Sequence, residues 1–339
     1  MKIAFIISSL GSGGAERVLS LLANYFSNNN EIYIITLSNE DSFYNLNKNI
    51  KHIKLNLFKK SKNKIETIIN STKRILILKK TLKQIDADVN ISFMTPVNML
   101  SIISSKINKQ KIIVSERTAF HFSGKLKNIF YRFSDYFVTQ TKADLKNYNL
   151  KKKTYIYNPF IFIDKEIKKE KIVLAVGRLE KEKRFDRLIE VFNKIDTDWQ
   201  LWIIGDGSLK EELNSLIKKD NIKLLGKKKN IFDYYAKASI FVLSSEIEGF
   251  PNVLIEAMAY KCAVVSYDCL YGPSEIIENN KNGILVNNKQ QLKESIELLI
   301  ENKKLREKLA NEAIKVREKY SIEKIAKEWE NVIKEVING

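Results

Sequence analysis

The fold is decided by the stretch 240–256, which reads IFVLSSEIEGFPNVLIE. Its apolar start over 240–243 indicates a buried strand, polar residues end that strand, and a helical pattern begins at Pro251. Proline suits a first helical turn because its missing N–H would have no intrahelical partner there. The backbone amides at such a helix start, including those of Gly249 and Phe250, carry a partial positive charge that suits a phosphate or a sugar hydroxyl. The stretch therefore predicts a strand–loop–helix unit with an anion-binding turn.

The same alternation of apolar strand runs and helical patterns continues along the chain, and it is typical of parallel sheets built from βαβ units. The predicted strands are 3–8, 32–37, 53–57, 89–93, 111–115, 136–139 and 154–157, then 172–177, 200–205, 223–226, 240–243, 263–266 and 283–286. At 339 residues the chain is too long for one ordinary core. A lysine run at 151–153, Asn158-Pro159 and the charged stretch 164–171 place a domain boundary near residue 160. We expect two similar doubly wound α/β domains that face each other across a cleft.

Composition indicates a soluble globular protein, with 44% hydrophobic and 29% charged residues and no apolar run long enough to cross a bilayer. The apolar start of the chain is followed by a glycine-rich loop and an amphipathic helix, so we interpret it as a first core strand and not as a signal peptide. Cys262 and Cys269 match no redox or zinc motif and make no disulfide framework. The expected location is the cytoplasm.

A formal charge of +18 points to nucleic acid, an anionic membrane surface or phosphate-bearing ligands, and charge alone does not choose among them. The segment Lys59–Lys83 alternates lysines with isoleucines and leucines as a basic amphipathic helix. It could lie on an anionic leaflet or bind the diphosphate of a lipid-linked acceptor, or it could be a solvated helix packed on its own domain. Nucleic acid fits less well, because no zinc, helix-turn-helix or aromatic RNA-binding motif accompanies the charge.

Arg178 and Lys183 follow the strand 172–177, where ligands of open α/β sheets bind. Arginine can bind phosphate oxygens with a planar fork and lysine adds a point charge. In the next turn, Gly205-Asp206-Gly207, we expect a structural role, with Asp206 capping the following helix.

The first loop, Gly11–Glu16, resembles a dinucleotide motif but has Glu16 at its third glycine position, and the second strand ends without an acidic residue for a ribose. These departures argue against a dehydrogenase. The two Asp-x-Asp sequences, at 86–88 and 196–198, precede strands, so they predict polar turns and no metal site.

The Glu-x7-Glu pattern from Glu248 to Glu256, the pair Arg178 and Lys183, and the loop 13–17 (GGAER) together resemble glycosyltransferase family 4, a family of retaining enzymes with the GT-B fold. The resemblance covers nearly the full length and is strongest to bacterial members that extend lipid-linked oligosaccharides. It implies two Rossmann-like domains, an acceptor-binding one at 1–160 and a nucleotide-sugar-binding one at 161–320. It also implies a helix over 321–339 that returns to the first domain.

The resemblance assigns roles to residues. Glu248, Arg178 and Lys183 are expected to be catalytic, with Glu248 on the donor sugar and the two cations on the donor diphosphate, while Glu256 holds the nucleotide ribose. The remaining expected donor-binding residues are Gly13, Gly14, Gly249, Phe250, Pro251 and Asn252. The usual family glycine after the lysine is replaced here by Arg184.

Further candidates follow Ser115 and Gly272. Many family members carry a histidine near the transferred sugar two residues after the equivalent serine, where this chain has Arg117, and the nearest histidine is His121. Either residue could take that role, and the adjacent Glu116 is a further candidate. In the related bacterial subset a Gly-Pro-Ser-Glu turn lies close to the donor, which makes Glu275 another candidate.

The implied function is retaining transfer of a hexose or N-acetylhexosamine from a nucleotide diphosphate sugar, UDP being the first choice, to a lipid-linked glycan. It needs no metal, no cofactor and no nucleic acid, and it would place the protein peripherally on the inner face of the cell membrane. Two rival hypotheses remain, a UDP-sugar epimerase of the same fold and a non-catalytic basic nucleic-acid-binding protein.

Overall fold

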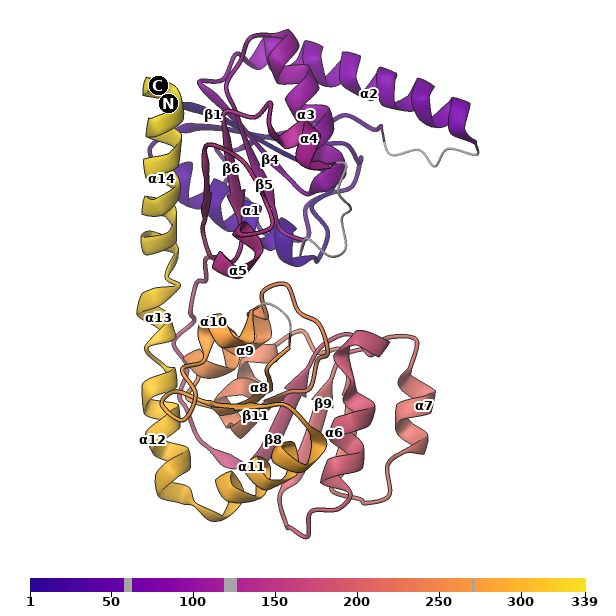
Figure 1. The fold of residues 1–339 in the computed structure, drawn as a ribbon, viewed down its shortest axis with the longest axis vertical. Coiled ribbons are helices and arrows are strands. Elements are labelled where there is room, and N and C mark those ends of the chain that lie inside the picture. Colours follow the sequence, from indigo (N-terminus) through magenta and orange to yellow (C-terminus); the bar gives the residue numbers. More distant parts are fainter. Residues whose placement is uncertain (58–62, 119–126, 270–271) are drawn as a thin grey trace. The chain divides into compact units, whose positions relative to one another are not determined.

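The computed structural model describes residues 1–57, 63–118, 127–269 and 272–339. The chain divides into two compact units, the first formed by Met1–Ile161 together with Tyr320–Gly339 and the second by Phe162–Lys319 (Figure 1). Each unit has its own parallel sheet and its own hydrophobic core. No helix in the described ranges is both long enough and apolar enough to span a bilayer.

The sheet of unit 1 has seven strands in the order β3-β2-β1-β4-β5-β6-β7, and all neighbouring pairs are parallel. The order reverses between β1 and β4, as in a doubly wound fold. Every strand predicted for this part of the chain is present, with ends shifted by a few residues at most. The strands are β1 (Lys2–Ile7), β2 (Glu31–Thr36), β3 (Lys51–Lys54), β4 (Val89–Phe93), β5 (Ile112–Glu116), β6 (Tyr136–Thr139) and β7 (Lys153–Tyr155).

Helices cover both faces of this sheet, because alternate residues of the buried strands point to opposite sides. Ile3, Phe5 and Ile7 of β1 pack with α1 (Gly14–Phe26) and α14 (Ile322–Asn338). Ala4 and Ile6 pack with α2 (Lys64–Ile85) and α3 (Thr95–Ile107) on the other face. Two short helices, α4 (Lys127–Tyr131) and α5 (Lys142–Leu145), follow β5 and β6. The carboxyl-terminal helix is thus part of the core of unit 1.

The sheet of unit 2 has six parallel strands in the order β10-β9-β8-β11-β12-β13, with its reversal between β8 and β11. Again every predicted strand is present. The strands are β8 (Glu170–Val176), β9 (Gln200–Ile204), β10 (Ile222–Gly226), β11 (Ala238–Leu243), β12 (Ala263–Tyr267) and β13 (Ile284–Val286). The predicted doubly wound α/β class is therefore confirmed for both halves of the chain.

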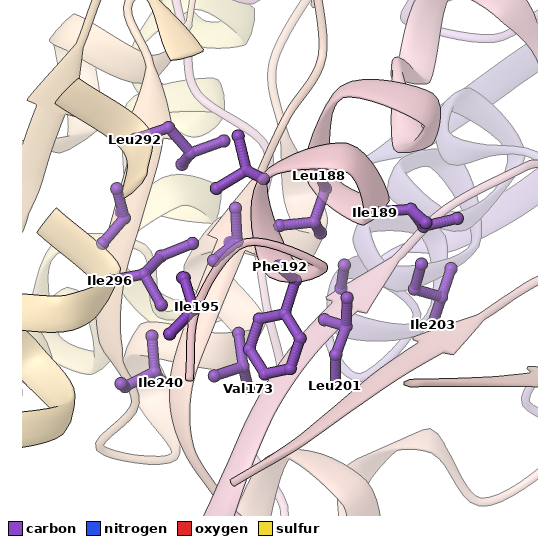
Figure 2. Close-up of a cluster of buried hydrophobic side chains, with 14 of the residues drawn as sticks. Val173, Leu188, Ile189, Phe192, Ile195, Leu201, Ile203, Ile240, Leu292 and Ile296 are labelled. Carbon is purple, nitrogen blue, oxygen red and sulfur yellow. The ribbon is translucent and has the colours of Figure 1, made fainter. Parts of the chain in front are cut away.

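One face of this second sheet carries a large apolar cluster (Figure 2). Phe192 of α6 (Phe185–Phe192) and Ile296 of α11 (Lys289–Glu301) pack there with Val173 of β8. The other helices of the unit are α7 (Lys210–Ser215), α8 (Ile231–Lys237), α9 (Asn252–Ala259), α10 (Pro273–Ile276), α12 (Lys303–Ala313) and α13 (Val316–Lys319). This packing holds β8 and β11 rigidly, so the loops that follow the two strands start from fixed positions.

Candidate functional site

The loops that follow β8 and β11 meet at the carboxyl edge of the second sheet, at its reversal point. The Ser244 hydroxyl donates to the Lys183 carbonyl oxygen at 2.8 Å. The Glu246 amide donates to the Glu182 carbonyl oxygen at 2.9 Å. Ligands of doubly wound sheets bind at this kind of position, because neighbouring loops diverge there and leave their ends exposed.

The two loops bring the predicted residues Lys183 and Glu248 into direct contact. The Lys183 Nζ lies 2.7 Å from Glu248 Oε1, and the two side chains are only 18% and 10% exposed. The Ser245 hydroxyl donates to the same carboxylate oxygen at 2.6 Å. Because the pair is shielded from water, its attraction is stronger than that of a surface ion pair. The carboxylate and the ammonium are thus held in place before any ligand arrives.

The negative charge of this carboxylate affects the nearby thiol of Cys269. Burial and the Glu248 carboxylate together raise the pKa of the Cys269 thiol to about 12. A thiol with so high a pKa is a poor nucleophile near neutral pH. We therefore assign no chemistry to Cys269.

Arg178 does not join this pair. Its side chain is 74% exposed, and its Nη2 donates to Glu182 Oε1 at 2.7 Å. An exposed ion pair of this kind contributes at most about 1 kcal/mol, so an anionic ligand can replace Glu182 at little cost. The backbone beside Arg178 is more firmly held, since the Leu179 amide donates to the Asp206 carbonyl oxygen at 2.9 Å.

Arg184 explains why the family has a glycine after the lysine. Its backbone is left-handed, with φ of 50° and ψ of 42°, a conformation that glycine adopts at no steric cost. The Arg184 guanidinium donates to Asp186 at 3.0 Å and to Glu246 at 3.3 Å, which offsets the strain. The left-handed position is therefore held here by an arginine whose side chain is anchored by two carboxylates.

The turn after β9 requires glycine and does not cap a helix. A Cβ at Gly205, where φ is 153°, would lie 1.8 Å from the carbonyl oxygen of Gly177. The prediction that Asp206 caps the next helix is wrong, because α7 begins at Lys210 and the Asp206 side chain accepts from the Gly207 amide instead. The turn serves to let the β8 and β9 loops pack closely.

Helix α9 begins one residue later than the sequence predicts. Pro251 is its N-cap, with φ of −76° and a non-helical ψ of 86°, and Asn252 is the first helical residue. Gly272, with φ of 90°, lies against this turn, where an added Cβ would meet Pro251 Cδ at 2.5 Å. This contact places the turn before α10, the helix that carries Glu275, against the start of α9.

Glu256 lies on the buried side of α9. Its Oε2 accepts a hydrogen bond from the Tyr235 hydroxyl at 3.0 Å, and Tyr235 is fully buried in α8. Sequence reasoning missed Tyr235, as it missed Ser244 and Ser245. The tyrosine gave no local signal, because it fits the pattern as one more apolar position of its helix. The two serines did give one, since polar residues at the carboxyl end of a buried strand lie where ligands bind.

In unit 1, Gly13 and Gly14 form the start of α1. Gly13 is the N-cap, and its carbonyl oxygen accepts from the Tyr44 hydroxyl at 3.1 Å. A Cβ at Gly13 would lie 2.2 Å from a carboxylate oxygen of Glu16, so these residues pack tightly. Burial raises the pKa of the Glu16 carboxyl.

Glu116 is fully buried and belongs to an internal polar cluster. It accepts from the hydroxyls of Thr95 and Tyr131, each at 2.6 Å, and the Lys127 ammonium lies 3.8 Å away. Burial and the Glu116 charge raise the pKa of Tyr131. In the described structure the carboxylate therefore faces the interior of unit 1.

Arg117 also points inward, which differs from the sugar-facing position that the resemblance implies. It donates to Ser115 Oγ at 2.9 Å and to Asn158 Oδ1 at 3.0 Å, and its guanidinium lies 5.6 Å from the ring of Trp329 in α14. Burial lowers the pKa of Arg117 to about 9. Arg117 thus links α14 to the sheet of unit 1. The alternative residue, His121, lies outside the described residues.

The Asp-x-Asp sequences are polar turns. Asp88 accepts from the Lys2 amide at 2.7 Å, and Asp198 pairs with Lys171 at 2.5 Å. Among the residues that the structure describes, no three His, Cys, Asp or Glu side chains gather in a group that could hold a metal ion.

Comparison of the sequence with known proteins identifies its family. Residues 158–316 match the family Glycosyl transferases group 1. The chain is 32% identical, over the full length of both proteins, to a GalNAc-α-(1→4)-GalNAc-α-(1→3)-diNAcBac-PP-undecaprenol α-1,4-N-acetyl-D-galactosaminyltransferase of Campylobacter jejuni.

Solved structures share the fold. The lipopolysaccharide outer core galactosyltransferase WaaB aligns with a TM-score of 0.81 at 22% identity, covering 98% of this chain and 99% of WaaB. Anabaena HepE, solved in complex with UDP, aligns with a TM-score of 0.80 at 16% identity, covering 99% of this chain and 100% of HepE. These alignments confirm the predicted GT-B class of fold. With its doubly wound sheets and its full-length similarity to the Campylobacter enzyme, the chain belongs to the group 1 glycosyltransferases and is a glycosyltransferase.

Proposed function

We propose that the protein transfers a hexose or N-acetylhexosamine from a UDP-sugar to a lipid-linked glycan with retention of anomeric configuration. The observation that carries this proposal is the buried pair of Lys183 and Glu248 at the reversal point of the second sheet. The name of the Campylobacter relative, which acts on an undecaprenol-linked glycan, supports the acceptor class. The neighbour solved with UDP supports the nucleotide.

In this proposal the donor diphosphate replaces Glu248 as the partner of Lys183. A diphosphate carries more charge than one carboxylate, so the exchange favours the ligand. Glu248 then keeps the bond from the Ser245 hydroxyl and turns its remaining acceptor capacity to the hydroxyls of the donor sugar. Arg178 leaves its exposed partner Glu182 and adds a second cation to the diphosphate.

The proposed reaction requires stabilisation of the negative charge that develops on the departing diphosphate. Lys183, Arg178 and the amides at the start of α9 would supply that stabilisation from fixed positions, each typically worth about 10²–10³ in rate. No protein nucleophile is needed, because the departing phosphate can take the proton of the acceptor hydroxyl on the same face of the sugar. Glu256, held by Tyr235, would orient the nucleotide ribose.

The test is a product assay with a panel of nucleotide sugars and an undecaprenyl-diphosphate-linked glycan. We expect acceptor extension with one UDP-sugar, with the anomeric configuration retained by NMR. An isomerised donor in the absence of acceptor would favour the epimerase hypothesis. Steeply salt-dependent binding to DNA or RNA without affinity for UDP would favour the nucleic-acid hypothesis.

We further propose that the outer face of α2 rests on an anionic membrane. Ile68, Ile69 and Leu76 on this helix are 66%, 60% and 58% exposed. Lys73 and Lys80 share the exposed side, whereas Leu78 and Leu82 pack into the core of unit 1. The amino-terminal half of α2 extends away from the sheet (Figure 1). Apolar side chains between lysines on one face match the boundary of an anionic leaflet. The lysines at 59, 60 and 62 lie outside the described residues.

Vesicle co-sedimentation tests this surface. The double variant Ile69→Ser/Leu76→Ser should bind phosphatidylglycerol vesicles less than the wild type. Its rate of donor hydrolysis, or of sugar transfer to a soluble acceptor, should equal that of the wild type. Phe43→Ser is a matched control, since Phe43 is an exposed apolar residue of the same unit outside α2. Equal vesicle binding by the α2 variant and the control would refute the membrane proposal and leave the transferase proposal intact.

A further inference from the structure

A second charged cavity lies in unit 2, at the sheet edge opposite the Lys183–Glu248 pair. Its volume is about 580 Å³. Its wall includes Glu170, the first residue of β8, Ser239 near the start of β11, and Trp199 just before β9. These positions belong to the amino ends of the parallel strands, whereas Lys183 and Glu248 follow their carboxyl ends. The cavity is therefore separate from the proposed donor site.

The wall of this cavity is strongly basic. Five cationic side chains line it, against the two carboxylates of Glu170 and Glu307. Both carboxylates already have lysine partners, at 3.7 Å from Lys237 and from Lys303 respectively. The five cationic residues are Lys169, Lys171, Lys261, Lys303 and Arg306.

Three of the cations have no carboxylate partner within ion-pair distance among the described residues. The Lys169 ammonium donates to the carbonyl oxygens of Tyr235 at 3.0 Å and Ala238 at 2.5 Å. Arg306 stacks on Trp199, with its guanidinium 4.8 Å from the ring centroid, and its Nη1 donates to the carbonyl oxygens of Leu299 and Ile300. Lys261 is exposed at the wall on left-handed backbone, with φ of 57°.

We propose that this cavity is a binding site for a phosphate-bearing ligand. Cations gathered around a partly enclosed space repel one another, and a bound dianion removes that repulsion while it gains charge-assisted hydrogen bonds. Arg306 offers the free side of its guanidinium for a bidentate contact, and Lys261 offers an exposed ammonium in the same wall. The ring of Trp199 holds the guanidinium plane in position. The cavity is large enough for a pyrophosphate or for a phospholipid headgroup, which present the same chemistry.

Burial gives independent support. It lowers the pKa of the Lys169 ammonium, whose partners are carbonyl oxygens and the Cys262 thiol. Burial likewise lowers the pKa of Arg306. A cation that is largely buried, as Lys169 is, or partly buried, as Arg306 is, gains when a charge of opposite sign reaches it. A phosphate in the cavity would supply that charge to both side chains.

Calorimetric titration with inorganic pyrophosphate at low ionic strength tests the site. The variants are made in an Arg178→Ala/Lys183→Ala background, which removes both cations of the proposed donor site, and in it we expect one remaining pyrophosphate site. Adding Lys261→Glu should weaken that binding by at least about tenfold, the usual effect of losing one charge-assisted bond. The matched control is Lys194→Glu, the same charge change at an exposed lysine outside the cavity. Lys261 is itself exposed, so its replacement leaves the core intact.

Vesicles distinguish the two sources of phosphate. If Lys261→Glu, but not Lys194→Glu, lowers binding to phosphatidylglycerol vesicles, the site takes a lipid headgroup. If only pyrophosphate binding falls, the site takes a soluble phosphate compound. If Lys261→Glu changes neither, or if wild-type protein binds neither probe at this place, the inference is overturned. Transfer activity with the proposed donor is measured separately, so failure of one proposal does not affect the other.

Discussion

Both sheets carry charged side chains at their carboxyl edges, at the end of β5 in unit 1 and after β8 and β11 in unit 2, yet these side chains have different partners. In unit 1, Glu116 and Arg117 at the end of β5 point into the interior and bind Tyr131, Asn158 and the ring of Trp329. In unit 2, Lys183 and Glu248 follow β8 and β11 and bind each other at a partly open edge.

This difference separates structural from functional charge. The partners of Glu116 and Arg117 are fixed parts of the core, so a ligand cannot take their place without unfolding. The partner of Lys183 is another side chain at the edge, which a ligand of higher charge can replace. The carboxyl edge of a parallel sheet can therefore serve stability in one unit and, as we propose, ligand exchange in the other.

The largest expected effect on stability is in unit 1. Lys127→Met removes the ammonium 3.8 Å from the buried Glu116 and should lower the free energy of unfolding by up to about 3–5 kcal/mol, because the carboxylate loses its lysine partner, although it keeps the charge of Arg117. Chemical denaturation measures this loss. The double variant Glu116→Gln/Lys127→Met should recover part of it, since neither charge remains. A double variant as unstable as the sum of the two single variants would show that the pair is not coupled.

The largest expected effect on activity is in unit 2. Lys183→Ala should reduce turnover about 10²–10³-fold, because the proposed diphosphate loses a fixed cation. The melting temperature should fall less than in Lys127→Met, since Glu248 keeps the hydroxyl of Ser245. Steady-state kinetics with the identified donor provides the measurement, and Lys194→Ala is the matched control. Unchanged turnover in Lys183→Ala would contradict the functional assignment of the pair.

A smaller effect tests the backbone of the same loop. Arg184→Ala keeps the left-handed backbone and loses the ion pairs with Asp186 and Glu246, whereas Arg184→Gly loses the same pairs but removes the strain. The glycine variant should therefore be more stable than the alanine variant by about 1 kcal/mol. Thermal unfolding of the two variants gives the comparison. Equal stability would mean that the loop relaxes away from its left-handed conformation.

The smallest effect concerns pH. Burial, with a contribution from Lys54, lowers the pKa of His52, whose Nε2 lies 3.0 Å from Thr36 Oγ1. A lowered pKa means that the unfolded chain binds the proton more tightly, so stability falls as pH drops below the unfolded value near 6.5. Both histidines of the chain, His52 and His121, fall within the sequence range of unit 1. The melting temperature of the His52→Gln variant should therefore fall less between pH 7.5 and pH 5 than that of the wild type, because this variant lacks the His52 titration.

Much of the fold could be predicted from local patterns. The apolar runs at 89–93 and 136–139 became strands with the predicted bounds, because a strand buried on both faces needs a continuous apolar run. Boundaries near special residues were harder. Pro251 was predicted to begin its helix and is the N-cap, in a turn that packs against Gly272, a residue distant in sequence.

The candidate site was predictable as a set of residues and not as a geometry. Sequence motifs selected Lys183 and Glu248, but nothing local indicates that their side chains touch, because they are 65 residues apart. The opposite holds for Arg117, which was a candidate by its place in a motif. Its guanidinium instead lies over the rings of Phe93 in β4 and Trp329 in α14, two residues that are distant from it in sequence.

By itself the sequence determined the βαβ alternation, the glycine-requiring turns and the residue types at the carboxyl edges, because periodicity and backbone sterics act over a few neighbouring residues. Only the tertiary structure decided which charges are buried in the interior and which meet at an edge. That choice depends on strand order, which sets β8 beside β11 and α14 against β4, and strand order comes from contacts between distant parts of the chain.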